Sequence, residues 1–586
     1  AMLIGTAMVS TTSGLLEVRQ GGAEPAARAA ARLPFLLGAA LYATTLGLVE
    51  AGQTNYLSGI IFLYALGFLS WVVASRYRPH WRLFTRVDLL LLGAAALAGM
   101  ILYLHDINSW FYSWIGDEYA FYSQADGLLH GVSANVFSQV GVYGYHPEAD
   151  SVYQAGVMLV LGAHELGWKA SSALAGVLPV FPIFLLARLT YSRSAAWLAV
   201  GIYLPAQLII AYAHTGYNNL DALFPLMSAL ALVVAAHQYR SPFYLFLAGV
   251  AAGFGWYTFY TARFAIILLA LSVLVWRSSW RRDAGFIVAG FALSLLPFVL
   301  VNGTRFMSGI LGESAITGHA HPIPISSLLA QNFLRSLFAF FYSNQIDNHW
   351  VVGAMFDRAS ALFLLIGLAT LLTRRSRRDI FVVLCLTVLV FGTVMTFYNP
   401  SIPTTRINIA LPLAAVVAGF GAARLIGFVE DMVKLPNWGR MGLAIVAVAI
   451  VAALNFNNFY RVVPSLVQAT PTALEMKVIL AHPRATVLVA PDLASLTLDD
   501  PLEVYDMPPQ HVAQAFVWTE ALPGIETAGD RPVEILSAGT LPTALPGRRS
   551  LVWDSSHLTE LRSAYSKRWS QAEKRRVIRW IKRQES

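Results

Sequence analysis

Thirteen apolar segments, most of them long enough to cross a bilayer, constrain this sequence more than any other feature. About 20 mostly apolar residues span the hydrocarbon core of a membrane as a helix. Only 13% of the residues are charged and the mean hydropathy is +0.57, which excludes a purely soluble protein. The sequence therefore predicts a polytopic α-helical membrane protein. The predicted helices lie at 33–50, 57–75, 87–104, 169–187, 194–212, 220–238, 242–259, 264–276, 284–301, 359–373, 380–397, 407–428 and 441–456.

The basic residues of the short loops predict the orientation of these helices. Every Lys-rich or Arg-rich short loop lies on the same side when the segments are threaded alternately through a membrane, as the clusters at 76–86, 188–193, 277–282 and 374–378 illustrate. Cytoplasmic loops carry such an excess of Lys and Arg. The net charge of +8 is thereby explained by topology, and no nucleic acid partner is expected.

The same threading divides the chain into three parts. Residues 1–32 form a cytoplasmic N-terminal segment, and residues 33–456 form the transmembrane domain with extracytoplasmic loops at 105–152 and 302–357. The polar residues 457–586 are predicted to form a small extracytoplasmic α/β domain. Its predicted strands lie at 485–490, 502–507, 532–536 and 550–554, and its predicted helices at 472–481 and 569–583.

Two further features restrict the chemistry. Cys385 is the one cysteine of the sequence, which excludes an intramolecular disulfide and a cluster of thiolate metal ligands. The glycine-rich stretch 249–255 lies inside an apolar segment, where glycine permits close helix packing and does not indicate a phosphate-binding loop.

The loop 105–152 holds six acidic residues and no Lys or Arg. Asp117 and Glu118 stand between the aromatic strings WFYSWIG and YAFY, which places two carboxylates in partly apolar surroundings at the membrane surface. Such surroundings raise the pKa of a carboxyl group and suit a general base. Asp106, Asp126 and Asp150 are interpreted as ordinary acids of an outer loop.

Two strings in and after this loop resemble those of a known superfamily. The string DEYAFYSQADGLLHG at 117–131 resembles the first extracytoplasmic loop of GT-C glycosyltransferases, especially bacterial relatives of protein O-mannosyltransferases and of the lipid A aminoarabinose transferase. The string HPEADSVYQAGVMLVLG at 146–162 is similar to their His-Pro-Pro-Leu-Tyr segment, with Glu148 in place of the second Pro. The resemblance extends through about residues 110–430.

The resemblance implies an enzyme of the glycosyltransferase class (EC 2.4). Its donor would be a sugar on a polyprenyl phosphate, and its acceptor a glycan, lipid or protein on the extracytoplasmic face of a bacterial cytoplasmic membrane. The family's proposed catalytic base corresponds to Asp117, with Glu118 as a neighbour that binds metal, binds acceptor or tunes the base. Family members invert the sugar configuration, so one base suffices.

Further candidate residues lie at the outer ends of later helices. Asp221 matches a second acid of the family, and the alternative is an acid that the dipole of a helix N-terminus favours. His214 either ligates a divalent metal with Asp117 and Asp221 or is a hydrogen-bonded interfacial histidine, and no cofactor is firmly implied. Glu148 is an extra ligand or a solvated acid. The remaining candidates for substrate or metal contacts are His146, Tyr217 and Tyr257.

Arg263 and Arg406 lie in outer loops that otherwise avoid Arg. A planar guanidinium can hold two phosphate oxygens at once, as a lipid-phosphate leaving group requires. The alternative is that both side chains extend to ordinary lipid headgroups. Membrane lipids are an expected partner under either interpretation, because the apolar helices contact them.

Two other functions fit many helices and a polar cavity. A transporter or flippase for a lipid-linked glycan is one, and a noncatalytic scaffold with a GT-C-like fold is the other. A transporter should carry charges near the centres of its helices and often shows inverted repeats. The candidates in this sequence cluster at outer helix ends, which favours the transferase.

Overall fold

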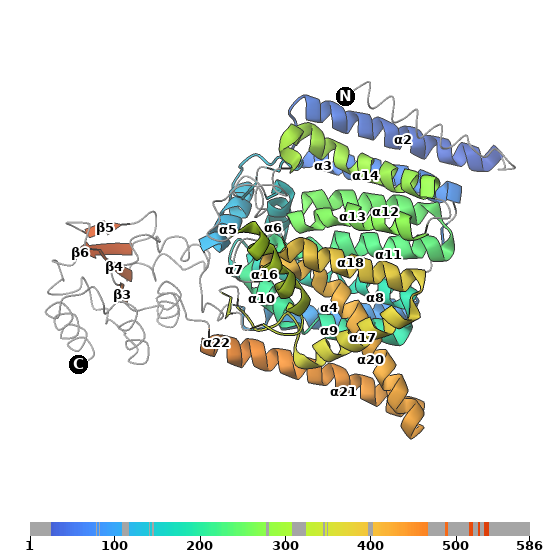
Figure 1. Cartoon of the computed structure of the whole chain (residues 1–586). Coiled ribbons are helices and arrows are strands. Elements are labelled where there is room, and N and C mark those ends of the chain that lie inside the picture. The colour runs from blue at the N-terminus through green and yellow to red at the C-terminus, as the bar shows by residue number, and fades with distance from the viewer. Residues whose placement is uncertain are drawn as a thin grey trace.

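The structure, a computed structural model, describes residues 25–466 with short gaps and four strands further along the chain. The gaps fall at 78, 81–82, 108–115, 140, 143–145, 277–279, 308–323, 344–345, 348–349 and 396–401. Helices that lie side by side make up the described part of residues 25–466, and α5 and α6 lie at one end of this bundle (Figure 1).

The helices follow the predicted apolar segments closely. The first group comprises α2 (Pro25–Glu50), α3 (Tyr56–Tyr77), α4 (Arg86–Leu104), α5 (Gly116–Leu129), α6 (Glu148–Leu161), α7 (Glu165–Val177), α8 (Val180–Thr190), α9 (Arg193–Tyr203), α10 (Gln207–Thr215), α11 (Leu223–Tyr239), α12 (Pro242–Phe254), α13 (Phe264–Trp276) and α14 (Trp280–Asn302). The second group comprises α16 (Ile325–Phe338), α17 (Arg358–Arg374), α18 (Arg377–Val394), α19 (Thr404–Ile407), α20 (Leu411–Val433), α21 (Asn437–Asn457) and α22 (Val463–Leu466).

Short elements connect these helices. Single helical turns are η2 (Asn218–Leu220), η3 (Gly255–Tyr257), η4 (Tyr260–Arg263), η5 (Gly303–Met307), η6 (Asn408–Ala410) and η7 (Asn458–Val462). The strands β1 (Ile346–Asp347) and β2 (Val351–Val352) form a small antiparallel pair within the predicted outer loop 302–357.

Eight helices of the described residues are long and apolar enough to cross a membrane, or nine if the bent pair α9 and α10 is one span. Each of the thirteen predicted segments coincides with helical structure, because apolar runs of this length satisfy their backbone polar groups internally. Thirteen crossings are not confirmed, since α12 and α13 are short and the segment of α9 and α10 is bent.

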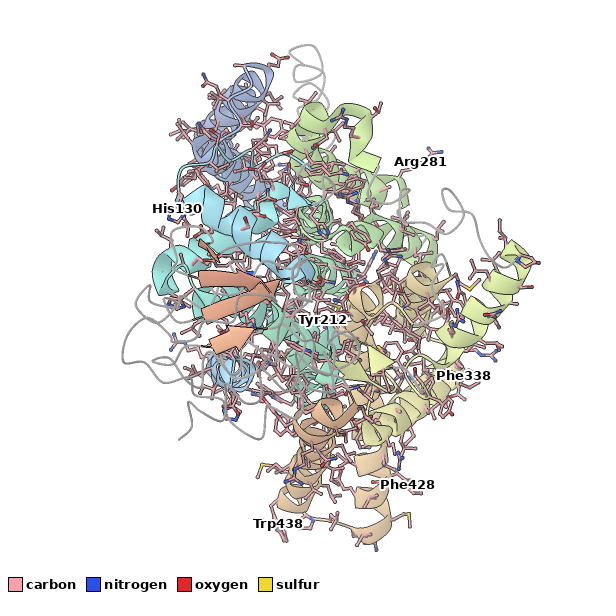
Figure 2. The ribbon with its side chains drawn as sticks, turned by 90° about the vertical axis from the view of Figure 1, so that its left-hand side faces the viewer. His130, Tyr212, Arg281, Phe338, Phe428 and Trp438 are labelled. Atoms are coloured by element: carbon pink, nitrogen blue, oxygen red, sulfur yellow. The ribbon has the colours of Figure 1, made fainter. Side chains whose placement is uncertain are left out.

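Burial separates an inner set of helices from an outer one. In the most apolar stretches of Glu165–Thr190 and of Thr404–Val433, 83% of the residues are buried. The corresponding share for Asn437–Leu466 is 11%. Tyr212 lies in the middle of the molecule, whereas Phe428 and Trp438 are exposed at its edge (Figure 2). Apolar side chains that remain exposed on outer helices match a hydrocarbon environment, which agrees with an integral membrane protein.

Two glycines explain the close packing of α12 against α14. A Cβ added to Gly249 would lie 2.1 Å from the carbonyl oxygen of Ile287, and one added to Gly290 would lie 2.1 Å from that of Phe246. Only glycine fits such an approach of two backbones. The packing role predicted for the glycine-rich stretch is therefore confirmed.

The span formed by α9 and α10 is bent by 50° where Pro205 interrupts it. Side chains from other helices satisfy the backbone groups that this break exposes. The Tyr103 hydroxyl donates to the Leu204 carbonyl oxygen at 2.9 Å, and the Gln207 N–H donates to the Asn455 side chain at 2.9 Å. An interrupted helix at membrane depth is tolerated only with such partners.

Hydrogen bonds around the buried Asp88 connect three of the predicted cytoplasmic loops. Asp88 is fully buried in the first turn of α4, where it forms a reciprocal cap with Thr85. Its carboxylate accepts hydrogen bonds from Arg188 and Arg193, each at 2.9 Å. Arg378 in turn donates to the Leu189 carbonyl oxygen at 2.8 Å. These basic loops therefore share one end of the bundle, as the alternate threading requires.

Four strands are described in the C-terminal region: β3 (Val487–Val489), β4 (Ala515–Thr519), β5 (Ile525–Thr527) and β6 (Val533–Ser537). They form a sheet in the order β3-β4-β6-β5, parallel except for the β5–β6 pair. The predicted strands at 485–490 and 532–536 match β3 and β6, whereas β4 and β5 were not predicted. The predicted strands at 502–507 and 550–554 and the helices at 472–481 and 569–583 lie outside the described residues, so the α/β domain stays a prediction.

Replacing Asp88 should destabilise the protein more than replacing an acid in an exposed ion pair. Asp88→Asn removes the charge that both Arg188 and Arg193 contact, and we expect a loss of about 1–3 kcal/mol because hydrogen bonds to charged groups are worth this much. Glu430→Gln, which breaks an exposed pair with Arg440, is the control and should cost less than about 1 kcal/mol. Melting temperatures in detergent measure both, and equal losses would contradict the assigned role.

Candidate functional site

The candidate site lies at the opposite end of α4 from the Asp88 cluster. Since α4 has 19 residues, its ends are about 28 Å apart. At the far end, the His105 carbonyl oxygen lies 3.1 Å from the His214 ring. The predicted basic loops and the predicted site residues therefore lie on opposite faces of the bundle.

The acidic pair of the first loop begins α5. Asp117 is the second residue of this helix, and the structure describes its backbone only. Glu118 is 1% exposed, so the second acid is deeply buried instead of solvated. The ring of Phe121, one turn further along α5, contacts His146 at 5.0 Å and Tyr217 at 5.2 Å between centroids. These contacts hold the beginning of α5 against the segments that carry the other candidates.

Asp150 and Asp221 form a pair of carboxyl groups that hydrogen-bond to each other. Asp150 lies in the first turn of α6 and is 3% exposed, so the interpretation of Asp150 as an ordinary loop acid is wrong. Burial raises its pKa well above the usual range, and the charge of Asp221 raises it further. Two adjacent carboxyl groups in a buried site cannot both ionise at low cost, so at least one of them keeps its proton.

A turn between α10 and α11 brings Asp221 to this position. Gly216 ends α10 with φ of 68°, and a Cβ there would lie 2.5 Å from the Trp168 ring. The next turn, η2, places the Asn218 amide so that it donates to Asp150 at 2.6 Å. The same amide nitrogen lies 3.3 Å from His146. Asn218 thus connects the buried acid to a histidine that the sequence had marked as a candidate.

Arg263 is a buried cation that interacts with Asp150 of this pair. It is 3% exposed, and its guanidinium carbon lies 4.7 Å from the Trp256 ring centre and 6.0 Å from that of Phe298. Its charge interacts favourably with Asp150. Arg263 therefore offsets the negative charge that forms when a member of the pair ionises.

Arg406 is half-buried on α19 and donates through Nε to the Tyr260 hydroxyl at 2.7 Å. Tyr260 begins the turn η4 that ends at Arg263, so both predicted phosphate ligands are attached to one short element. The segment around Arg406 is held by a hydrogen bond from the Asn219 amide to the Thr405 carbonyl oxygen at 3.1 Å. The structure thus connects Arg406 to the turn that precedes Asp221.

The other candidates of the sequence lie around these groups. His146 is buried and stacks on Phe259 at 5.6 Å. Glu148 accepts a hydrogen bond from the Asn135 N–H at 2.8 Å, and burial raises its pKa, so it is not a solvated acid. The Tyr217 carbonyl oxygen accepts from Ser172 at 2.7 Å. The Tyr257 hydroxyl donates to the Ser294 carbonyl oxygen at 3.0 Å.

The geometry does not support a metal site at His214. Its Nδ1 lies 2.7 Å from the Ile210 carbonyl oxygen and its Nε2 faces that of His105, so both ring nitrogens face backbone oxygens. The interpretation as a hydrogen-bonded histidine is the one that fits. Within the described part of the chain, no group of three or more His, Cys, Asp or Glu side chains is placed to hold a metal ion.

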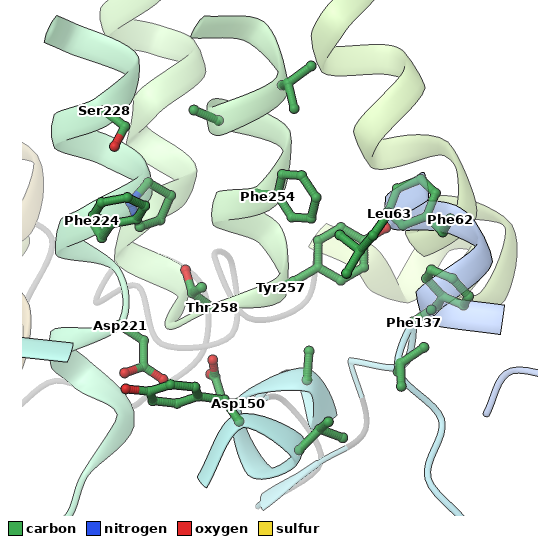
Figure 3. A pocket seen from close by; sticks show the side chains of 18 of the residues that line it. Phe62, Leu63, Phe137, Asp150, Asp221, Phe224, Ser228, Phe254, Tyr257 and Thr258 are labelled. Atoms are coloured by element: carbon green, nitrogen blue, oxygen red, sulfur yellow. The ribbon is translucent and has the colours of Figure 1, made fainter. Parts of the chain in front are cut away.

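A cavity of about 690 Å³ ends at the carboxyl pair (Figure 3). Its walls come from α3, α6, α7, α11 and α12 and are mostly apolar, with Phe62, Leu63, Phe224 and Phe254 among them. Tyr257 and Thr258 also line it, whereas Arg263 and Arg406 do not. The cavity therefore has an apolar body and an acidic end.

Sequence reasoning missed Asp150, the role of Asn218 and the contact of Tyr260 with Arg406. A signal for Asp150 exists in the sequence. Asp150, Tyr153 and Gln154 have the spacing of one helix face in an otherwise apolar helix, and a polar stripe of this kind faces a protein interior or a cavity. The contacts of Asn218 and Tyr260 have no such local signal, because their partners lie 68 and 146 residues away.

The comparisons with known proteins agree with the resemblance. Residues 146–301 match the family described as dolichyl-phosphate-mannose-protein mannosyltransferase. This segment contains His146, Asp150, Asp221 and Arg263. The resemblance to GT-C glycosyltransferases is therefore confirmed for the part of the chain that holds most of the candidate site, and the comparison with curated proteins gives no match.

Similar solved structures have low sequence identity. The structure of ArnT from Cupriavidus metallidurans bound to undecaprenyl phosphate is 14% identical, with 74% of this chain and 86% of that chain covered and a TM-score of 0.49. The oligosaccharyltransferase AglB from Archaeoglobus fulgidus, in complex with an inhibitory peptide and a dolichol-phosphate, is 13% identical. It covers 72% of this chain and 63% of that chain, with a TM-score of 0.44.

The raised pKa of Asp150 makes stability depend on pH. Above the usual value of 3.8, the folded protein keeps a proton that the unfolded chain has lost, so the free energy of unfolding falls as pH rises. Asp150→Asn mimics the protonated acid and should flatten the fall in melting temperature as the pH rises above the usual carboxyl value of 3.8. Asp126→Asn on α5, where the side chain is 16% exposed and pairs with His130, is the control. Parallel curves for wild type and Asp150→Asn would contradict the buried pair that keeps a proton.

Proposed function

We propose that this protein is an inverting glycosyltransferase that moves a sugar from a polyprenyl-phosphate donor to an acceptor on the extracytoplasmic face of a membrane. The observation that carries the proposal is the family match at 146–301, which contains the carboxyl pair and Arg263. ArnT binds undecaprenyl phosphate and AglB binds a dolichol-phosphate in their solved structures, so lipid phosphates are ligands of those two proteins.

In the proposed reaction an acceptor oxygen attacks C1 of the sugar from the face opposite the phosphate. The C1–O bond to the lipid phosphate breaks, its electron pair stays on the phosphate, and Asp117 takes the acceptor proton. One displacement inverts the configuration at C1. Glu118, the next residue of α5, is buried and is proposed to tune the base.

Arg406 is proposed to hold the leaving phosphate. Its guanidinium is half-buried and its Nε donates to the Tyr260 hydroxyl, which fixes the position of a planar group that can hold two phosphate oxygens. Arg263 lies on η4, the same turn as Tyr260, and its charge interacts favourably with Asp150. Prearranged cations of this kind stabilise the charge that develops on a leaving oxygen.

The positions of the candidates favour a transferase over a transporter. Asp150 and Asp221 lie in or beside the first turn of a helix, and Arg263 and Arg406 lie in short helical turns that precede α13 and α20. A transporter's coupling groups are expected near the middle of the membrane. The basic loops at the other end of α4 support an extracytoplasmic active site.

Replacing the proposed base should abolish most of the turnover and leave donor binding nearly unchanged. Asp117→Asn keeps the shape of the side chain but cannot accept a proton, and loss of a general base costs about 10² to 10⁴-fold in rate. Asp126→Asn, nine residues further along the same helix, is the matched control. Transfer of labelled sugar from a polyprenyl-phosphate donor measures turnover, and near-normal turnover of Asp117→Asn would exclude it as the base.

Replacing Arg406 should damage both donor affinity and rate, because the phosphate is charged in the donor and gains charge in the transition state. Arg406→Lys keeps the charge without the two-pronged geometry, so it should fall between wild type and Arg406→Ala. Arg440→Ala at the predicted cytoplasmic end is the control. Interchangeable Arg and Lys with a loss of stability alone would indicate contact with bulk lipid headgroups instead.

A further inference from the structure

The cavity that ends at Asp150 and Asp221 has a charge pattern that restricts what it can bind. None of its described lining residues is Lys, Arg or His, and its acidic groups are Asp150 and Asp221. A phosphate placed at this end would face two carboxyl groups, and no described lining residue supplies a cation to bind it. The leaving phosphate of the proposed donor therefore does not belong in this cavity.

The shape of the cavity fits an apolar chain. The cavity extends from Asp221, just before α11, to Leu232 on that helix. At the rise of an α-helix, these eleven residues correspond to about 16 Å. Its volume of about 690 Å³ and its apolar walls are typical of a site for a small ligand, in which a few polar groups fix the orientation. Phe224 and Phe254 line the apolar part, away from the acidic end (Figure 3).

The hydroxyl groups near the acidic end are engaged with backbone carbonyls. Tyr153 donates to the Ser171 carbonyl oxygen at 2.9 Å, and Tyr257 and Thr258 donate to those of Ser294 and Gly255. A ligand at this end therefore meets the carboxyl pair. Asp221 is the partly accessible member, whereas Asp150 behind it is buried and held by Asn218. A pair that keeps a proton can both donate and accept a hydrogen bond.

We infer that this cavity binds an amphiphile with an apolar chain and an uncharged alcohol head, whose hydroxyl hydrogen-bonds to Asp221 and its partner Asp150. An alcohol both donates and accepts, so it matches a pair that keeps a proton, without a change of charge. Arg263 already offsets the negative charge of an ionised member of that pair, so a cationic head is not needed. Binding of this alcohol does not depend on the transfer reaction. A role of the alcohol as the acceptor would rest on the proposed function.

Three probes with one apolar chain and different heads test this inference: farnesol, farnesyl phosphate and farnesylamine. Each is titrated into the full-length protein in lipid nanodiscs, and binding is measured by native mass spectrometry. Farnesol should bind, and Ala251→Phe, which fills the cavity from α12, should weaken its binding at least about tenfold, or 1.4 kcal/mol. The matched control Ala94→Phe lies on an exposed face of α4 and should leave binding unchanged.

Variants of the acidic pair test the choice of head group. The double variant Asp150→Asn with Asp221→Asn removes the negative charge, so farnesyl phosphate should gain binding that Ala251→Phe abolishes. In the wild type, binding of farnesyl phosphate should not respond to Ala251→Phe. Ser228→Leu on α11 narrows the cavity with a smaller side chain and replaces Ala251→Phe if that variant fails to fold.

Several results would overturn the inference. Farnesyl phosphate that binds as well as farnesol and responds to Ala251→Phe would make the cavity a lipid-phosphate site. Preference for farnesylamine would mean that the pair is recognised as two ionised groups. Farnesol binding that ignores both cavity variants would place the alcohol elsewhere. Failure of sugar transfer with farnesol binding intact would contradict the proposed function and leave this inference standing.

Discussion

Backbone groups at membrane depth need partners inside the protein, and this constraint shapes the functional end of the molecule. Long helices satisfy it within themselves, but the chain leaves the helix at Pro205 and again after Gly216. Side chains from distant helices supply the missing partners, with Tyr103, Asn455 and Ser172 bonding to groups at or after these breaks. The same interruptions turn the chain so that Asn218 and Asp221 meet the beginning of α6.

The buried charges at this end form a balanced set. Asp150 and Asp221 lie together in a buried site that favours their protonated forms, and Arg263 interacts favourably with Asp150 when it ionises. Burial of an unbalanced charge is costly, so each member of the set depends on the others. The arrangement separates two kinds of surface. The acidic end faces an apolar cavity, and Arg406 lies outside that cavity beside Tyr260. A neutral head and a phosphate therefore have different places to bind.

The family match and the geometry support each other at residue level. The matched segment begins at His146 and includes the acidic pair, Arg263 and most of the cavity wall. The first acidic pair of the sequence, Asp117 and Glu118, lies before this segment at the start of α5, and Phe121 connects that helix to His146 and Tyr217. The candidate base and the matched segment are thus parts of one assembly of helices.

The sequence by itself determined the helices, the alternation of basic loops and most of the candidate residues. These are local signals: apolar length, charge between segments and short motifs around Asp117, Asp221 and Arg406. The tertiary structure decided which residues meet. Asp150 looked like an ordinary loop acid because its surroundings come from residues around 218–221 and 263, and β4 and β5 of the C-terminal sheet carry no comparable local pattern. Burial, a retained proton and a cavity are properties of contacts between distant segments, and the order of residues along a chain does not contain them.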